Sequence, residues 1–345
     1  MSMMKGAALY GPRDIRVEKM KIPTLGPGEA LVKIDCCGIC PSDVKAYMGN
    51  WRTSLTYPLV LGHEWVGEVV DIASDVRNVH PGERVAACWR VTCGTCGFCR
   101  RGDMSCCVSL SKERAVGGFT EYGRLDASSL YPIPDNVEYE EACFAEPLAC
   151  CINGQEMTGV RQGDDVVVIG AGPIGLLHVQ LSCARGARVI AVDHIEERLA
   201  MALDLGAHDI ICSSAMDLRE AVGKLTAGKG ADRVIVAAGA ASAVSDALDI
   251  AANCGVVNVF AGISPPFKIE LDPNLIHYRQ VSLTGSHDFN PSHFQLGLKL
   301  LGDGVISTRR MISHRVALDR IEEGFEIVAN RRGAKVVIDM RREAQ

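Results

Sequence analysis

Five cysteines stand close together in the segment VTCGTCGFCRRGDMSCC, and their spacing suits a metal ion. Cys93, Cys96 and Cys99 are separated by two residues each, and either Cys106 or Cys107 follows closely enough to supply a fourth thiolate. Four sulfur ligands suit a tetrahedral zinc ion that has no open coordination position, so this site would be structural. Spacing alone does not choose between Cys106 and Cys107.

A second set of possible ligands is spread over the motifs GICPSD, LGHEWVG and FAEPLAC, which contain Cys40, His63, Glu64 and Glu146. One sulfur, one nitrogen and one or two carboxylates can form a zinc site with three protein ligands and an open position. Zinc in such a site acts as a Lewis acid on a substrate oxygen. A lone His–Glu pair is also common at surfaces and caps, so these residues alone leave a non-metal interpretation open.

A dinucleotide fingerprint follows an apolar strand in VVVIGAGPIGLLHVQLSCARGARVIAVD. Gly170, Gly172 and Gly175 permit a tight turn and a close approach of a pyrophosphate to the start of a helix. Asp193, after the next strand, is placed to bind ribose hydroxyls. Its charge favours NAD over NADP, and Arg198 would oppose that preference if it pointed at the same place.

Two patterns of secondary structure must position these residues. Short alternating stretches separated by Gly, Pro, Asn and Asp predict a mostly β region, and later apolar runs alternate with helical stretches, which indicates a parallel sheet with crossover helices. We therefore expect an α/β protein with a β-rich domain at 1–151 and a doubly wound parallel-sheet domain at 152–286. A C-terminal segment, 287–345, is expected to complete the first domain.

Composition narrows the class of partner. The chain has 345 residues, is 48% hydrophobic and carries a net charge of −6, which argues against nucleic acid or an anionic membrane as the main partner and favours a small-molecule substrate. The glycine-broken apolar runs do not suit a membrane span. Fifteen cysteines and an N-terminus without a secretory pattern predict a reducing, cytoplasmic location.

The order of GICPSD, LGHEWVGEVV, the spaced cysteines, AEPLAC and VVVIGAGPIG resembles the zinc-dependent medium-chain dehydrogenases over nearly the whole chain. Within that family, the sequence is similar to the polyol (sorbitol or L-iditol) and L-threonine dehydrogenase branch. The resemblance implies a GroES-like catalytic domain that carries one catalytic and one structural zinc, and a Rossmann domain that binds NAD. It also implies a homotetramer or homodimer.

The resemblance assigns roles in the metal sites. Cys40, His63 and Glu146 match catalytic zinc ligands, Glu64 matches a carboxylate next to the metal, and Cys107 matches the fourth structural ligand.

The resemblance also assigns residues that contact the substrate and the cofactor. Ser42 matches the hydroxyl that contacts a zinc-bound alcohol, Lys45 stands where many relatives have a relay histidine, and Pro41 replaces a usual glycine. The positions that match the cofactor site are Gly170, Gly172, Pro173, Ile174, Gly175, Asp193, Arg198, Ala261, Gly262, Ile263, Ser286 and His287.

The predicted reaction is the oxidation of a secondary hydroxyl of a polyol, cyclitol or related sugar derivative to a ketone, with NAD as hydride acceptor. Alternatives are an L-threonine 3-dehydrogenase-like or a sugar-acid or polyol-phosphate dehydrogenase. An alternative of another class is a non-catalytic nucleotide-binding protein with structural zinc only. Candidates for the substrate wall are Tyr47, Trp51, Arg52, Trp89, Arg90, Lys112, Arg114 and Phe119.

Overall fold

The computed structural model describes residues 2–51, 53–109, 117–263 and 268–342 and divides the chain into two compact units. One unit joins Met1–Ala149 to Asn290–Gln345, and the other is Cys150–Phe289. From the sequence we expected the domain boundaries after residues 151 and 286. Among the substrate-wall candidates, Arg52, Lys112 and Arg114 lie outside the described residues.

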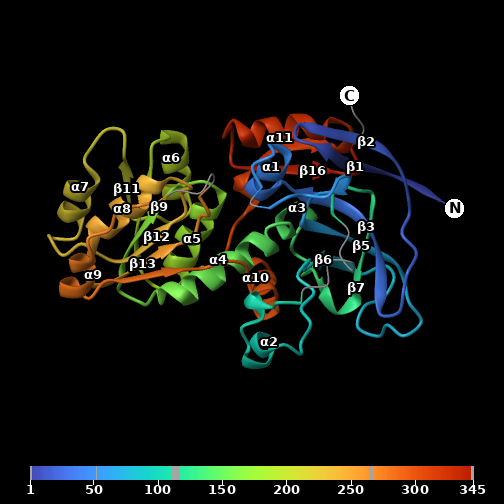
Figure 1. Ribbon diagram of the computed structural model, residues 1–345, viewed down its shortest axis with the longest axis horizontal. Helices are drawn as coiled ribbons and strands as arrows, with labels where there is room; N and C mark the ends of the chain where they lie inside the picture. The colour runs from blue at the N-terminus through green and yellow to red at the C-terminus, as the bar shows by residue number, and fades with distance from the viewer. Residues whose placement is uncertain (1, 52, 110–116, 264–267, 343–345) are drawn as a thin grey trace. The chain divides into compact units, whose positions relative to one another are not determined.

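The first unit is built on two β-sheets (Figure 1). One has the order β2-β1-β4, and the other has the order β15-β16-β3-β5-β6-β8, with β7 also paired to β3. The strands are β1 (Met3–Gly11), β2 (Asp14–Lys21), β3 (Glu29–Gly38), β4 (Leu59–Val60), β5 (Glu64–Ile72), β6 (Arg84–Ala87), β7 (Tyr122–Asp126), β8 (Leu130–Pro132), β15 (Ile312–Ala317) and β16 (Lys335–Asp339). Thus β15 and β16, from the end of the chain, complete a sheet begun near its start.

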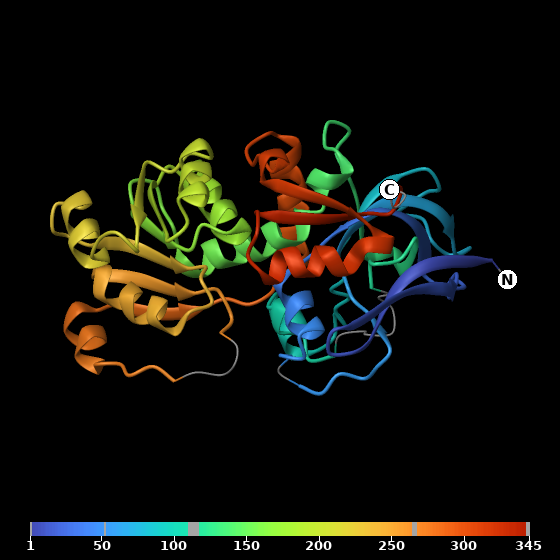
Figure 2. The same cartoon turned by 90° about the horizontal axis from the view of Figure 1, so that it is seen from above.

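Short helices flank these sheets. The helices are α1 (Pro41–Tyr47), α2 (Gly97–Arg101), α3 (Tyr139–Ala142), α10 (Pro291–Gly302) and α11 (Ile321–Ala329), with 3-10 turns η1 (Met104–Cys106), η3 (Ala127–Ser129), η4 (Arg309–Met311) and η5 (Leu318–Arg320). Figures 1 and 2 both show α11 alongside β16. Phe325 of α11 contacts the buried rings of Tyr47 and Phe119, so this helix closes the core over α1.

The second unit is a six-stranded parallel sheet of order β11-β10-β9-β12-β13-β14. The strands are β9 (Asp165–Ile169), β10 (Arg188–Asp193), β11 (Asp209–Cys212), β12 (Ala231–Val236), β13 (Ala251–Val259) and β14 (Ser282–Gly285). The helices are α5 (Pro173–Ala184), α6 (Glu196–Asp204), α7 (Leu218–Leu225), α8 (Ala241–Ile250) and α9 (Pro273–Arg279), and α4 (Ala145–Thr158) has residues in both units.

The central strand β9 is apolar throughout its interior, and Val166, Val167 and Val168 are fully buried because helices cover both faces of a parallel sheet. The strand order reverses between β9 and β12, which is where such sheets bind ligands at the carboxyl ends of their strands. The expected α/β class, with a β-rich domain and a doubly wound sheet, is confirmed. No helix among the described residues is long and apolar enough to cross a membrane.

Candidate metal and cofactor sites

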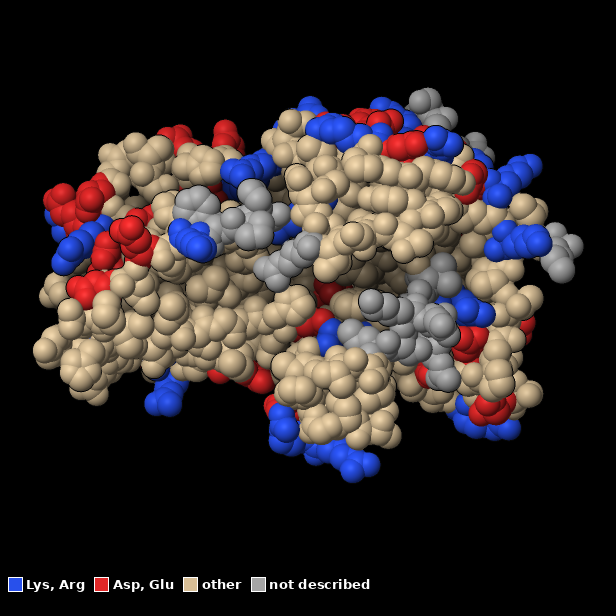
Figure 3. All heavy atoms as spheres, viewed as in Figure 1, with Lys and Arg blue, Asp and Glu red and all other residues tan. Residues whose placement is uncertain are grey.

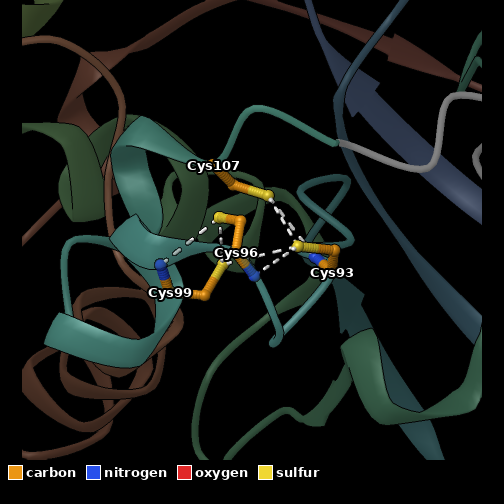
Figure 4. A group of neighbouring side chains, drawn as sticks. All are labelled: Cys93, Cys96, Cys99 and Cys107. Carbon is orange, nitrogen blue, oxygen red and sulfur yellow. Dashed lines mark hydrogen bonds between the residues drawn. The ribbon is translucent and has the colours of Figure 1, made fainter.

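The cysteine lobe, residues 93–107, brings four thiols together (Figure 4). The Sγ atom of Cys93 lies 3.9 Å from that of Cys99 and 3.6 Å from that of Cys107, and the Sγ atoms of Cys96 and Cys99 are 3.5 Å apart. Sulfurs around a tetrahedral zinc with Zn–S bonds of about 2.3 Å stand about 3.8 Å apart. These distances fit a zinc site and are far longer than a disulfide bond, which is about 2.05 Å.

Backbone N–H groups in the lobe point at the sulfurs. The N–H of Cys96 donates to Cys93 at 3.3 Å, and the N–H of Cys99 donates to Cys96 at 3.5 Å. The N–H groups of Thr95 and Cys96 lower the pKa of Cys93 to about 6, which favours the thiolate that binds metal. Burial raises the pKa of Cys99 to about 12, so a bound cation must displace a proton there.

The lobe distinguishes the two candidate fourth ligands. Cys107 is buried and belongs to the group of four, whereas Cys106 is exposed and does not. Figure 3 shows basic side chains gathered over α2, which carries the exposed Arg100 and Arg101. Their charge offsets part of the negative charge that four thiolates would bring to a zinc ion.

A second group of possible ligands comprises Cys40, His63 and Glu64, whose ligand atoms lie within 4.8 Å of one another. Cys40 is the N-cap of α1, where Pro41 occupies the first turn and the carboxylate of Asp43 accepts the Cys40 N–H at 3.0 Å. His63 lies between β4 and β5, and Glu64 is the first residue of β5. We call these three residues the Cys–His–Glu site.

Asp43 orients the histidine of this site. Its Oδ1 atom lies 3.4 Å from His63 Nδ1 and accepts the N–H of Gly62 at 3.2 Å. Burial lowers the pKa of His63, but the negative charges of Asp43 and Cys40 outweigh it and raise that pKa well above its usual range. Because Nδ1 faces Asp43, Nε2 is the nitrogen that suits a metal.

Lys335 of β16 holds the carboxylate of the site. Its ammonium contacts Glu64 Oε2, and both side chains are almost completely buried. Burial lowers the pKa of Lys335, but the charges of Glu64 and Cys40 raise it above its usual value. The site therefore combines a soft thiol, an imidazole and a carboxylate with a buried positive counter-charge, a donor set that suits zinc with an open position.

Glu146 lies near this site but is not a member of the group of three. It is on α4, 6% exposed, and its Oε1 atom accepts the indole N–H of Trp89 at 3.0 Å. Burial raises the pKa of Glu146, and the charge of His63 partly opposes that shift. The predicted ligand Glu146 is thus close to His63 but is held by Trp89.

In the second unit, the glycine loop follows β9 at the switch point. Gly170 has a φ of +101°, and a Cβ there would come within 3.0 Å of the Ala238 backbone nitrogen. A Cβ on Gly175 would overlap the carbonyl oxygen of Gly170, so helix α5 can approach the loop only with glycine here. Gly172 is the N-cap of α5, with Pro173 and Ile174 in the first turn, and this helix end suits a pyrophosphate.

Asp193 ends β10 beside this loop. Its Oδ2 atom accepts the N–H of Ala171 at 2.7 Å, and its Oδ1 atom accepts those of His194 and Ile195 at 2.8 and 3.0 Å. Arg198 Nη1 lies 4.0 Å from Asp193 Oδ2. The arginine therefore does point toward the acidic residue, which is the arrangement that weakens a preference for NAD based on Asp193 alone.

The remaining cofactor candidates follow the neighbouring strands. Ala261, Gly262 and Ile263 come after β13, and Ser286 and His287 come after β14, so all five stand at the carboxyl ends of adjacent parallel strands. Ser286 Oγ donates to the buried Asn258 at 3.0 Å, and Asn153 of α4 donates to the His287 carbonyl oxygen at 3.4 Å. These contacts hold the segment after β14.

The structure separates the substrate-wall candidates. Tyr47 and Phe119 are core residues, because their rings are almost completely buried against Phe325. Arg90 is also buried, and it donates to main-chain oxygens of the cysteine lobe. These three predictions were wrong, whereas Trp51 is 43% exposed and lines an open groove with Pro12, Thr53, Ser54 and Tyr57.

Two residues that contact the Cys–His–Glu site, Asp43 and Lys335, were not predicted from the sequence. Asp43 stands three residues after Cys40, and its capping position at the start of a helix was a usable signal. Lys335 stands in the apolar stretch AKVVIDM, where a lysine is unusual unless it is paired, but nothing in the sequence names Glu64 as its partner.

Family models match both units: "Alcohol dehydrogenase GroES-like domain" over residues 26–135 and "Zinc-binding dehydrogenase" over residues 173–303. Sorbitol dehydrogenase from Bombyx mori is 32% identical to this chain and covers 96% of it and 97% of its own length. L-threonine 3-dehydrogenase from Chelativorans sp. is 32% identical, with 98% and 99% covered. The chain belongs to the zinc-dependent medium-chain dehydrogenase family, as its motifs predicted.

Solved structures agree with this assignment. A Sinorhizobium meliloti structure described as a zinc-binding dehydrogenase bound to NADP is 34% identical, with a TM-score of 0.90 over 98% of this chain and 100% of that one. A structure from Escherichia coli CFT073, described as a short chain alcohol dehydrogenase complexed with NADH, is 29% identical, with a TM-score of 0.90 and 99% and 100% covered. Similar proteins have thus been seen with either dinucleotide.

Proposed function

We propose that this protein oxidises a secondary hydroxyl of a polyol, cyclitol or related sugar derivative to a ketone, with NAD as the hydride acceptor. The observation that carries the proposal is the Cys–His–Glu site, three donor types within 4.8 Å of one another in a family of zinc dehydrogenases. The similarity to a sorbitol dehydrogenase supports a polyhydroxy substrate. A homotetramer or homodimer in the cytoplasm is part of the same proposal, and fifteen free thiols favour that reducing compartment.

Each metal site has its own ligands in this proposal. Cys93, Cys96, Cys99 and Cys107 hold a structural zinc, and Cys40, His63 and Glu64 hold a catalytic zinc, with Glu146 beside it. Bound catalytic zinc supplies Lewis acidity that makes a coordinated hydroxyl easier to deprotonate, and bound NAD accepts the hydride.

The residues of α1 carry the proton in this proposal. Ser42 and Lys45 are three positions apart on that helix, so their side chains share one face. Ser42 accepts the hydroxyl proton from the substrate while its own hydroxyl proton leaves toward Lys45, and Lys45 gives up one proton to solvent as it takes up that one. Asp43, on the neighbouring face, keeps His63 oriented throughout.

The cofactor proposal rests on the glycine loop and Asp193. Gly170, Gly172 and Gly175 shape the loop that holds the pyrophosphate, and the carboxylate of Asp193 binds ribose hydroxyls and repels a 2′-phosphate. Arg198 is close enough to Asp193 to reduce that repulsion. We therefore expect NAD to be preferred over NADP by a modest factor, about tenfold.

Near-ultraviolet absorbance of NADH tests the proposal directly. Zinc-loaded protein and NAD are mixed with a panel of polyols, cyclitols, sugar acids, polyol phosphates and L-threonine, and His63→Ala serves as the control because it lacks one ligand and keeps the fold. The proposal is supported if the wild-type protein oxidises polyols or cyclitols and His63→Ala does not. Turnover of L-threonine, sugar acids or polyol phosphates instead would assign the protein to one of those substrate classes. The absence of turnover with any of these compounds, in protein with two zinc ions bound, would contradict the proposed function.

A further inference from the structure

Two buried carboxylates near Cys40 and His63 are held by different partners. Glu64 contacts the ammonium of Lys335 and belongs to the Cys–His–Glu site. Glu146 has a neutral partner, the indole N–H of Trp89, and lies outside that group of three ligand atoms. The two carboxylates are therefore not equivalent, and the difference lies in the side chain that restrains each one.

Trp89 touches two residues of this region at once. Its Nε1 atom donates to Glu146 Oε1 at 3.0 Å, and its ring stands edge-on to the His63 ring, with centroids 6.1 Å apart and an interplanar angle of 68°. An indole has one donor and no acceptor, so this bond fixes both the ring and one carboxylate oxygen.

The neighbouring residue ties Trp89 to the cysteine lobe. Arg90 is 4% exposed, and its Nη2 atom donates to the carbonyl oxygens of Met104, at 3.4 Å, and of Ser105. The guanidinium carbon lies 5.8 Å from the centre of the Trp89 ring. The N–H of Cys107, a thiol of the lobe, donates to the same Met104 carbonyl oxygen at 3.0 Å. A continuous chain of side-chain contacts thus connects the cysteine lobe, through Arg90 and Trp89, to Glu146.

We propose that Trp89 is a positioning residue for Glu146: its indole N–H keeps that carboxylate from joining Cys40, His63 and Glu64 on the metal. The proposal rests on the proposed function, because it presumes that a metal occupies the Cys–His–Glu site. Without the N–H, the Glu146 carboxylate is free to turn and takes the position that the substrate hydroxyl needs. Arg90, anchored in the cysteine lobe, holds the indole in place for this purpose.

The test is the visible spectrum of protein with cobalt in the Cys–His–Glu site and zinc in the cysteine lobe. Trp89→Phe keeps an aromatic ring and removes the N–H. We expect weaker cobalt d–d bands, which indicate an added ligand, and a kcat lowered about 2- to 10-fold with little change in KM, the factor that one hydrogen bond contributes. Glu146→Gln and the double variant are the matched controls, because Trp89→Phe should change neither quantity in the Glu146→Gln background.

Two results would overturn the proposal: an unchanged cobalt spectrum in Trp89→Phe, or the same loss of kcat in the Glu146→Gln background, which would indicate a packing role for the ring. If Trp89→Phe does not fold, Arg90→Gln, which keeps the indole and removes its anchor, must give a smaller change in the same direction. A wild-type spectrum that lacks a sulfur-to-cobalt band dependent on Cys40 would instead contradict the proposed function, so the two failures are distinguishable.

Discussion

The cysteine lobe and the Cys–His–Glu site are built in opposite ways. All four thiols of the lobe come from one short segment, and main-chain N–H groups of the same segment point at their sulfurs. The Cys–His–Glu site takes its donors from the N-cap of α1, from the residue before β5 and from the first residue of β5, and its counter-charge comes from β16, 271 residues away from Glu64. The lobe is therefore a local structure, whereas the other site exists only once the whole first unit has folded.

The sharpest way to test this contrast is to remove one donor from each. His63→Ala should lower kcat/KM by about three orders of magnitude or more, because the Lewis acid loses a ligand, and should leave the circular dichroism spectrum unchanged. Cys93→Ser should instead lower folded yield and Tm, because the lobe loses a ligand of a closed site. Normal turnover by His63→Ala would rule out the catalytic assignment.

Stepwise chelation should separate the two sites in one protein. The site with three protein ligands should lose zinc first and the four-thiolate lobe later, since a closed site holds its ion more firmly. We expect activity to disappear at the first step with Tm nearly constant, and Tm to fall by about 10 °C at the second. Zinc content, activity and Tm measured on the same samples check this order, and simultaneous loss of both ions would contradict it.

The long-range character of the Cys–His–Glu site predicts a stability effect at Lys335. In protein stripped of the zinc of the Cys–His–Glu site, Lys335→Met leaves the buried carboxylate of Glu64 without its counter-charge and should cost about 3–5 kcal/mol of unfolding free energy. Glu64→Gln in the same chain should recover a large part of that loss. Denaturant unfolding of the two single variants and the double variant measures the coupling, and additive losses would show that the pair contributes little.

Among the changes that test this contrast between the two metal sites, the smallest effect is expected at Asp43. Asp43→Asn keeps an oxygen that can accept an N–H but removes the negative charge beside His63 Nδ1. Zinc affinity of the Cys–His–Glu site should fall about 10- to 100-fold, while the affinity of the cysteine lobe stays the same. Competition with a chromophoric chelator, read separately for the two ions, gives both affinities. Equal weakening of the two sites would indicate a general loss of structure instead.

The same contrast explains what the sequence could predict. The spacing of Cys93, Cys96 and Cys99 and the glycines of the dinucleotide loop are local signals, because residues near in sequence must be near in space. Cys107 is buried among the other three thiols and Cys106 is exposed outside the group, a difference that spacing does not encode.

The rest depends on contacts made by the folded chain. Lys335 and Glu64 meet because β16 and β5 both pair with β3, and no local pattern indicates that pairing. Tyr47 and Phe119 were misassigned to a substrate wall because nearness to a metal motif in sequence does not tell which face of an element is buried. The α/β class was predictable because the periodicity of strands and helices is itself local.

The compactness of the cysteine lobe has a consequence for how such a chain can change over evolutionary time. The lobe lies between β6 and β7 and contributes no strand to either sheet. A gene could therefore lose this segment, or acquire one like it, in a single deletion or insertion. The residues that contact the lobe near Ser105, Arg90 and Asn290, would then have to change as well. The donors of the Cys–His–Glu site do not lie in one such segment, so they can change only one residue at a time within the sheets and helices of the first unit.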